Sequence, residues 1–495
     1  MKHPRLLTLL LLASCCTLAL GQPNTPSTAQ VQIDCDFCAG QKAAANVIDL
    51  SSDGFSRLAE TEVDAAGQAA FTLPVTGPLF AYITVGLGVP GQDSRYRVYL
   101  EPNQVLKLRI TNEKMEYTGK LSPANQYLDD SWKIMDIVGD EANAMVGQFR
   151  KFTREEQEMV AVSFNKRFVP LHEAITNDNR LTAEQKEILI DQNKLMVLWR
   201  IKALEGSDWD KLKEESSYEV PSFLSELPVR PAYLSSFMDS YRKVIELEIR
   251  THLVGSIFYA LEKEGFTNEK VGMSRIEDTL ILLTDRAIRG NTRLAPIREF
   301  LLAKNINLSF IDFGFRPQLV QNFTKFKEEY PNSSYLPPLE TIIGKHKQLG
   351  EGTEARDFTA TDANGNTFRL AELKGKVVYI DTWATWCGPC VAEFPHSKKM
   401  VEHYRDNRDV VFLFVSVDED TQKWKTFLKG DRAPQGIHVN QNSASTPDES
   451  SIFSLYGVSG VPHYILVDKA GKIKANRGPR PSEKESYELI DGLLK

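Results

Sequence analysis

Two cysteines near the C-terminus, Cys387 and Cys390, have the spacing in this chain that points most directly to chemistry. They follow an apolar run of strand type at 377–383 and precede a segment compatible with a helix. A helix N-terminus stabilises negative charge through its free N–H groups and its dipole, which lowers the pKa of a thiol placed there. Because thiolate is the attacking species in thiol–disulfide exchange, the arrangement predicts a pair that cycles between dithiol and disulfide.

The order of the two cysteines predicts their roles. Cys387 comes first and is the candidate nucleophile, while Cys390 lies about one helical turn further on and would attack the resulting mixed disulfide. Pro389 between them removes a backbone donor and stiffens the turn. Two other interpretations are half of a zinc site and a static disulfide. Zinc usually needs a second pair of ligands, and we predict neither a metal nor a cofactor.

A second close pair, Cys35 and Cys38, lies at the end of a predicted first strand. Three interpretations stay open for it. The pair could form a local disulfide in an oxidising compartment, exchange electrons with Cys387 and Cys390, or provide metal ligands or free thiols.

The elements that must position these residues fall into successive blocks. A chain of 495 residues is too long for a single core. Short runs at 69–75, 80–85, 96–100 and 105–110 have strand character and predict a small sandwich or barrel. After them, helical spacing prevails, beginning at Ser122–Pro123, with capping-box spacing at Thr153/Glu156 and at Thr182/Gln185.

We therefore predict four segments. A signal peptide at 1–21 is followed by a β-sandwich-like accessory domain at 22–118, whose first residues, to about 30, look like a flexible tether. An all-α domain with a linker covers 119–345, and the proline-containing residues 331–338 look like a helix terminus and linker. An α/β domain covers 346–495.

The N-terminus has the pattern of a targeting segment. Lys2 and Arg5 precede a short apolar stretch at 6–13, which is too short to span a bilayer. Two cleavage patterns are intact. Cleavage after Gly21 would leave a mature start at Gln22, whereas the lipobox-like 12–15 would leave a lipid anchor at Cys15. Either pattern predicts an exported protein in the periplasm or cell envelope.

The charge balance gives no sign of a nucleic-acid partner. The formal net charge is −7, and the sequence contains no long basic run. With 42% hydrophobic and 25% charged residues, the composition is that of an ordinary globular protein.

Several segments of the C-terminal block resemble one family. The stretch from Asp381 to Cys390 resembles the thioredoxin active-site segment, and 460–468 resembles the cis-proline loop with its following strand. The features at 357–359 and 364–365, and the sequence 390–395, resemble the exported TlpA/ResA-type proteins of the AhpC/TSA–redoxin superfamily. Arg356 departs from the family's usual proline. The regions in front resemble, more loosely, accessory domains fused to such proteins in Bacteroidetes-type bacteria.

The resemblance implies a thioredoxin fold for 346–495 and a set of site residues. Asp381 would be a buried carboxylate that exchanges a proton with Cys390, although an Asp hydrogen-bonded to a loop is an alternative. The Val461–Pro462 bond would be cis, would face the thiols and would pair with substrate. Trp386 would cover the site. Glu393 would either tune the thiols or lie on a solvated helix face.

The function that follows is an exported thiol–disulfide oxidoreductase that reduces the disulfides of client proteins and receives electrons from a membrane donor. Gly388–Pro389 resembles reducing thioredoxins and favours this direction. Peroxide reduction is an alternative, weakened because Ala384 stands where the peroxiredoxin pattern has Thr or Ser. A surface adaptor or binding lipoprotein is a third alternative, motivated by the roughly 300 residues in front of the α/β domain.

Overall fold

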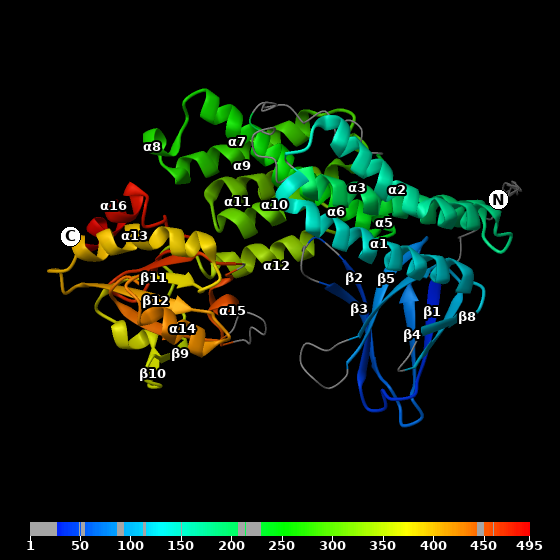
Figure 1. The fold of residues 1–495 in the computed structure, drawn as a ribbon, viewed down its shortest axis with the longest axis horizontal. Helices are drawn as coiled ribbons and strands as arrows, with labels where there is room; N and C mark the ends of the chain where they lie inside the picture. Colours follow the sequence, from blue (N-terminus) through cyan, green and yellow to red (C-terminus); the bar gives the residue numbers. More distant parts are fainter. Residues whose placement is uncertain are drawn as a thin grey trace, which may run out of the picture.

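The protein is described from a computed structural model, which covers residues 27–48, 50, 55–86, 94–111, 115–149, 151–205, 213, 229–442, 450–458 and 460–495. The predicted signal segment, 1–21, and Cys15 lie outside these residues. A strand-rich region and an α/β region lie at opposite ends of the molecule, and a helical region runs along both (Figure 1). None of the described helices is long and apolar enough to cross a bilayer.

The strand-rich region consists of two four-stranded sheets, of order β4-β1-β7-β8 and β3-β2-β5-β6. Burial alternates along β1, and Val31 and Ile33 face a core to which Ile83 and Val98 of the other sheet also belong. Two sheets around one core confirm the predicted sandwich-like fold. The predicted tether is wrong for Thr28–Gln30, which already belong to β1, and 22–26 lie outside the described residues. The strands are β1 (Thr28–Cys35), β2 (Lys42–Ile48), β3 (Phe55–Glu62), β4 (Gln68–Pro74), β5 (Leu79–Val85), β6 (Ser94–Leu100), β7 (Val105–Ile110) and β8 (Met115–Thr118).

The Cys35–Cys38 pair forms a local disulfide at the end of β1, with a Cα–Cα distance of 5.4 Å. Both side chains are buried in the core of the strand-rich region. The sequence left three interpretations open for this pair, and the structure has the local disulfide. Thiol–disulfide exchange requires access to a sulfur atom, and Cys35 and Cys38 are 0% and 1% exposed.

The middle region is all-helical, as predicted, and α1 packs over the sandwich through contacts with β6 and β8. Its buried apolar positions include Ile188, Leu189, Leu195 and Met196 of α3. The helices are α1 (Ser122–Phe149), α2 (Arg154–Asn177), α3 (Ala183–Glu205), α5 (Pro231–Ser235), α6 (Asp239–Leu247), a π-helical turn (Glu248–Leu253), α7 (Val254–Lys263), α8 (Asn268–Val271), α9 (Met273–Gly290), a 3₁₀ turn (Ala295–Ile297), α10 (Arg298–Phe313), α11 (Pro317–Glu329) and α12 (Leu336–Lys347).

Helix starts predicted from capping residues are confirmed. The Thr153 N–H donates to the Glu156 carboxylate at 2.6 Å, and the Glu156 N–H donates back to Thr153 Oγ1 at 3.3 Å. The corresponding distances between Thr182 and Gln185 are 2.9 and 3.1 Å. Each reciprocal pair satisfies two backbone donors that a helix start otherwise leaves without partners.

The predicted helix terminus and linker at 331–338 is confirmed for 331–335, which connect α11 to α12, and is wrong for 336–338. Pro337 and Pro338 stand in the first turn of α12, a helix that packs against α10. Proline is tolerated there because the N–H groups of the first turn have no partner within the helix. The prolines therefore mark a helix start instead of an irregular connection.

The C-terminal region has the predicted thioredoxin-like α/β fold, with a seven-stranded sheet of order β10-β9-β13-β12-β11-β14-β15. Every residue of the central strand β11 is buried, since helices cover both faces of the sheet (Figure 1). β11 pairs parallel with β12 and antiparallel with β14. The elements are β9 (Thr359–Asp362), β10 (Thr367–Arg369), a 3₁₀ turn (Leu370–Leu373), β11 (Val377–Trp383), α13 (Gly388–His403), β12 (Val410–Ser416), α14 (Thr421–Leu428), β13 (Ile437–Asn440), α15 (Ile452–Tyr456), β14 (His463–Val467), β15 (Ile473–Ala475) and α16 (Lys484–Leu494).

Candidate active site

Cys387 and Cys390 lie at the start of α13, where the chain leaves the end of β11. They are joined by a disulfide with a Cα–Cα distance of 5.3 Å. Cys387 is the N-cap residue of the helix, and its Sγ accepts a hydrogen bond of 3.2 Å from the Cys390 N–H. Cys387 Sγ therefore occupies the position at which a helix N-terminus stabilises negative charge.

The surroundings of the two cysteines are unequal. The Cys387 side chain is 4% exposed and that of Cys390 only 1%, while the preceding Trp386 is 64% exposed. An incoming disulfide therefore meets Trp386 and the edge of Cys387 before it meets Cys390. The order of attack stays a prediction.

Asp381 is buried in the middle of the sheet, in β11. Neither of its carboxylate oxygens has a hydrogen-bond partner among the described residues, which counts against the alternative of an Asp bonded to a loop. Burial, and to a smaller extent the Glu393 carboxylate, raises the pKa of Asp381 to about 8. A carboxylic acid with such a pKa can take up and release a proton near neutral pH.

The loop before β14 lies beside the end of β11. Thr382 of β11 is level with His463 of β14, which places Pro462 next to the point where β11 leads toward the cysteines. The Val461–Pro462 bond is cis, as the resemblance implies, and both residues are half-buried. Burial lowers the pKa of the adjacent His463 to about 3, which keeps this imidazole neutral.

Glu393, on α13, is buried and does not lie on a solvated helix face. Its carboxylate accepts hydrogen bonds from the Ser482 N–H and hydroxyl at 3.1 and 3.0 Å. Arg480 Nη1 lies 3.8 Å from it. Glu393 thus ties α13 to the segment before α16, and through its charge it contributes to the raised pKa of Asp381.

The Asp418 side chain holds the loop in front of the cysteines, and the sequence analysis did not identify this role. The Asp418 carboxylate accepts hydrogen bonds from the Thr385 N–H at 3.0 and 3.1 Å and from the Thr385 hydroxyl at 2.7 Å. The Ser416 hydroxyl also donates to Asp418, at 2.8 Å, and Asn440 Nδ2 donates to Ser416 Oγ at 3.0 Å. The sequence feature that could have indicated this role is the pair of polar residues, 416 and 418, at the end of an apolar strand.

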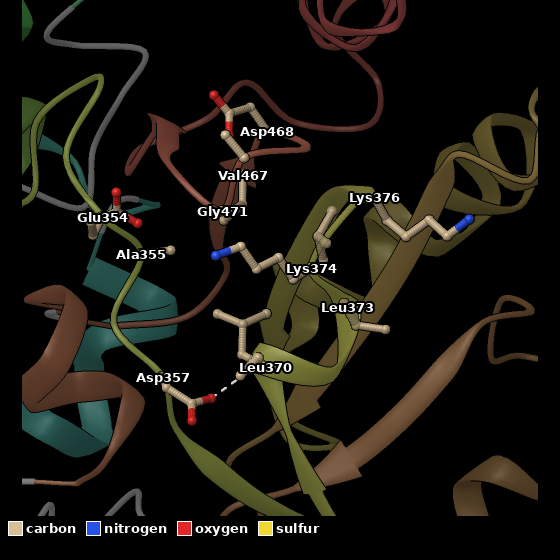
Figure 2. Close-up of a pocket in the computed structure, with 13 residues that line it drawn as sticks. Glu354, Ala355, Asp357, Leu370, Leu373, Lys374, Lys376, Val467, Asp468 and Gly471 are labelled. Carbon is tan, nitrogen blue, oxygen red and sulfur yellow. Dashed lines mark hydrogen bonds between the residues drawn. The ribbon is translucent and has the colours of Figure 1, made fainter.

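The pocket drawn in Figure 2 is distant from these residues along the sheet. It has a volume of about 170 Å³, and its lining includes Lys374 and Val378 at the start of β11 and Asp468 just after β14. The cysteines follow the opposite end of β11, so this pocket is separate from the thiol site. Among the described residues, no three His, Cys, Asp or Glu side chains converge as metal ligands would.

Comparison with known proteins covers the C-terminal region. The family model described as Redoxin matches residues 350–489. Thiol-disulfide oxidoreductase ResA of Bacillus thuringiensis (strain Al Hakam) is 33% identical over 146 residues, which are 29% of this chain and 76% of that protein. ResA of Bacillus subtilis (strain 168) is 29% identical over 132 residues, 27% of this chain and 69% of that protein.

Among solved structures, a crystal structure described as a candidate thiol-disulfide oxidoreductase from Bacteroides vulgatus is 37% identical. The match covers 30% of this chain and 99% of that one, with a TM-score of 0.27. The Redoxin match at 350–489 includes Cys387 and Cys390. This chain belongs to the ResA-type thiol–disulfide oxidoreductases, with a C-terminal redoxin domain behind a strand-rich and a helical region.

Proposed function

We propose that the protein is an exported enzyme that reduces disulfides of client proteins through the Cys387–Cys390 dithiol. The observation that carries this proposal is the place of Cys387 at the N-cap of α13, where its Sγ accepts the Cys390 N–H. After reduction, the same N–H and the helix dipole would stabilise a Cys387 thiolate.

In the proposed reaction, the Cys387 thiolate attacks one sulfur of a client disulfide. The client S–S bond breaks, a Cys387–client disulfide forms, and the other client sulfur leaves as a thiolate that takes a proton from water. Cys390, as a thiolate, then attacks Cys387 Sγ and releases the second client sulfur. Two electrons pass from the dithiol to the client, and the enzyme is left with the Cys387–Cys390 disulfide.

Asp381 is the proposed acceptor of the Cys390 proton in the second step. Its pKa of about 8 supports this role, because an acceptor works best when its pKa lies near the ambient pH. The Val461–Pro462 segment is the proposed ledge for the client backbone, and Trp386 the proposed cover for an apolar client side chain. The half-buried state of Val461 and the high exposure of Trp386 support these assignments.

Export is proposed from the basic and apolar N-terminal segment, and a lipid anchor at Cys15 follows from one of its two cleavage patterns. An oxidising compartment would leave the dithiol oxidised, so we propose a membrane protein as its electron donor. The redox step is assigned to 346–495, and the regions 22–118 and 119–345 are proposed to contribute to the choice of client.

The test is reduction of insulin by the purified protein with dithiothreitol as the electron source. We expect Cys387→Ser to abolish catalysis and Cys390→Ser to accumulate mixed disulfides with clients in cells. A Cys35→Ala/Cys38→Ala variant serves as the matched control and should keep its activity. Full activity of Cys387→Ser would rule out the proposed mechanism.

A further inference from the structure

A groove adjoins the redox motif on the side of α14. Its volume is about 570 Å³, and its lining includes Thr385, Lys423, Phe427, Gly430 and Arg432. Thr385 directly precedes the exposed Trp386. A client segment that passes over Trp386 would therefore continue into this groove.

The walls of the groove are held in place by hydrogen bonds and by ring packing. Thr385 is fixed by its hydrogen bonds to the buried Asp418 carboxylate. Asp420 caps α14 by accepting the N–H groups of Gln422 and Lys423, each at 3.0 Å. The Phe427 ring packs on Trp383 with ring centroids 5.2 Å apart. The groove is therefore a preformed surface, which lowers the entropy cost of binding an extended segment.

The lining of the groove carries one excess positive charge in a chain with a net charge of −7. Its charged lining residues are Lys423, Arg432 and Asp420. Lys423 Nζ lies 3.6 Å from the Asp420 carboxylate, so this charge is partly balanced. Arg432 is exposed, its guanidinium lies 5.1 Å from the centre of the Phe427 ring, and no described carboxylate forms an ion pair with it.

We propose that this groove binds an acidic, extended segment of the client next to its disulfide, with a client carboxylate paired to Arg432. The inference rests on the proposed function, since the client cysteine must reach Cys387. The Arg432 guanidinium lies beside the Phe427 ring, and the fork of N–H donors of a guanidinium matches the geometry of a carboxylate. Phe427 and Gly430 provide apolar and unobstructed surface for the backbone between the cysteine and the acidic side chain.

The test uses two synthetic peptide disulfides that differ only in Glu or Gln residues flanking the cysteine. The reduced full-length protein should reduce the Glu peptide faster, and the ratio of the two kcat/KM values should fall as salt rises. Arg432→Gln should lower this ratio about threefold to fivefold, the size expected of one exposed ion pair. Lys374→Gln is the matched control, because it removes one exposed cation at the other end of β11 (Figure 2) and should leave the ratio unchanged.

Three results would overturn the inference. Equal rates for the two peptides, or equal effects of Arg432→Gln and Lys374→Gln on the ratio, would remove the groove from client recognition while leaving the redox chemistry in place. Reduction of neither peptide by a protein whose thiols are demonstrably reduced would overturn the proposed function itself, and the groove assignment with it.

Discussion

Arg477, just after β15, donates a hydrogen bond of 3.0 Å from Nη1 to the backbone carbonyl oxygen of Asp312, near the end of α10. Its Nη2 donates to the neighbouring carbonyl of Ile311. The last carbonyls of a helix lack partners within the helix and carry the negative end of its dipole, so a guanidinium suits this position. Gly314 ends α10 with a φ of +73°, and a Cβ there would lie 3.2 Å from Arg477 Cδ. The helical region and the redox domain thus meet at a closely packed, hydrogen-bonded contact.

The first prediction concerns this contact. Arg477→Ala should loosen the redox domain from α10, because the two carbonyls lose their charged donor, at a cost of about 1.5–3 kcal/mol. Limited proteolysis should then cut the connection between α12 and β9, residues 348–358, on the order of ten times faster. Arg408→Ala is the matched control, since Arg408 is exposed in the same domain. Equal cleavage rates for the two variants would show that Arg477 does not hold the contact.

The second prediction concerns the protonation of Asp381. In the disulfide form, its pKa of about 8 lies above the unfolded value of 3.8. The folded state therefore holds a proton that the unfolded state has lost, and the contribution of this group to stability falls as pH rises from about 4 to 8. The slope should be about 1.4 kcal/mol per pH unit and should be absent in Asp381→Asn.

Infrared difference spectroscopy checks the assignment directly. The band of a protonated carboxyl group should disappear with a midpoint near pH 8, and Asp381→Asn should lack this transition. In single-turnover experiments the same variant should slow release of the client from the mixed disulfide more than formation of that disulfide. A carboxyl band at this position that titrates near pH 4 would contradict the prediction.

The sequence was most informative where local chemistry determines local structure. Capping boxes, strand periodicity and the position of Cys387 before a helix each depend on residues close together in the chain, and the structure has them where the sequence placed them. Pro337 and Pro338 were harder to interpret, because proline is equally typical of a linker and of a first helical turn.

The features that the sequence did not predict depend on contacts between residues that are far apart in the chain. Thr385 and Asp418 are 33 positions apart, and only the parallel pairing of β11 with β12 brings them together. The sequence left open whether Glu393 tunes the thiols or lies on a solvated helix face, because its partners Ser482 and Arg480 come from the far end of the domain. Neither relationship leaves a periodic signal in the sequence, because each depends on a partner residue that lies outside helices and strands.

The third prediction tests the Thr385–Asp418 pair. Asp418→Ala should leave the Thr385 N–H and the Ser416 hydroxyl without their buried acceptor and cost about 1–3 kcal/mol of stability. A double-mutant cycle with Thr385→Val, measured by urea unfolding of the oxidised protein, should give a coupling free energy above about 0.5 kcal/mol. Additive effects of the two substitutions would mean that the hydrogen bonds do not fix the loop.

The fourth prediction separates the two disulfides. Cys35 and Cys38 are 0% and 1% exposed in the core of the strand-rich region, whereas Cys387 borders the exposed Trp386 in the α/β region. Cys35→Ala/Cys38→Ala should therefore keep wild-type rates of insulin reduction. Because the bridge closes a loop of only a few residues, its loss should destabilise the protein by roughly 2 kcal/mol.

Thiol trapping gives an independent check of the difference in accessibility between the two disulfides. When native protein is treated briefly with a mild reductant and an alkylating reagent, Cys387 should be labelled and Cys35 and Cys38 should stay unlabelled until the protein unfolds. Peptide mapping would identify the labelled sites. Labelling of Cys35 under native conditions, together with slower insulin reduction by the double variant, would instead make this pair a second redox centre that exchanges electrons with the first.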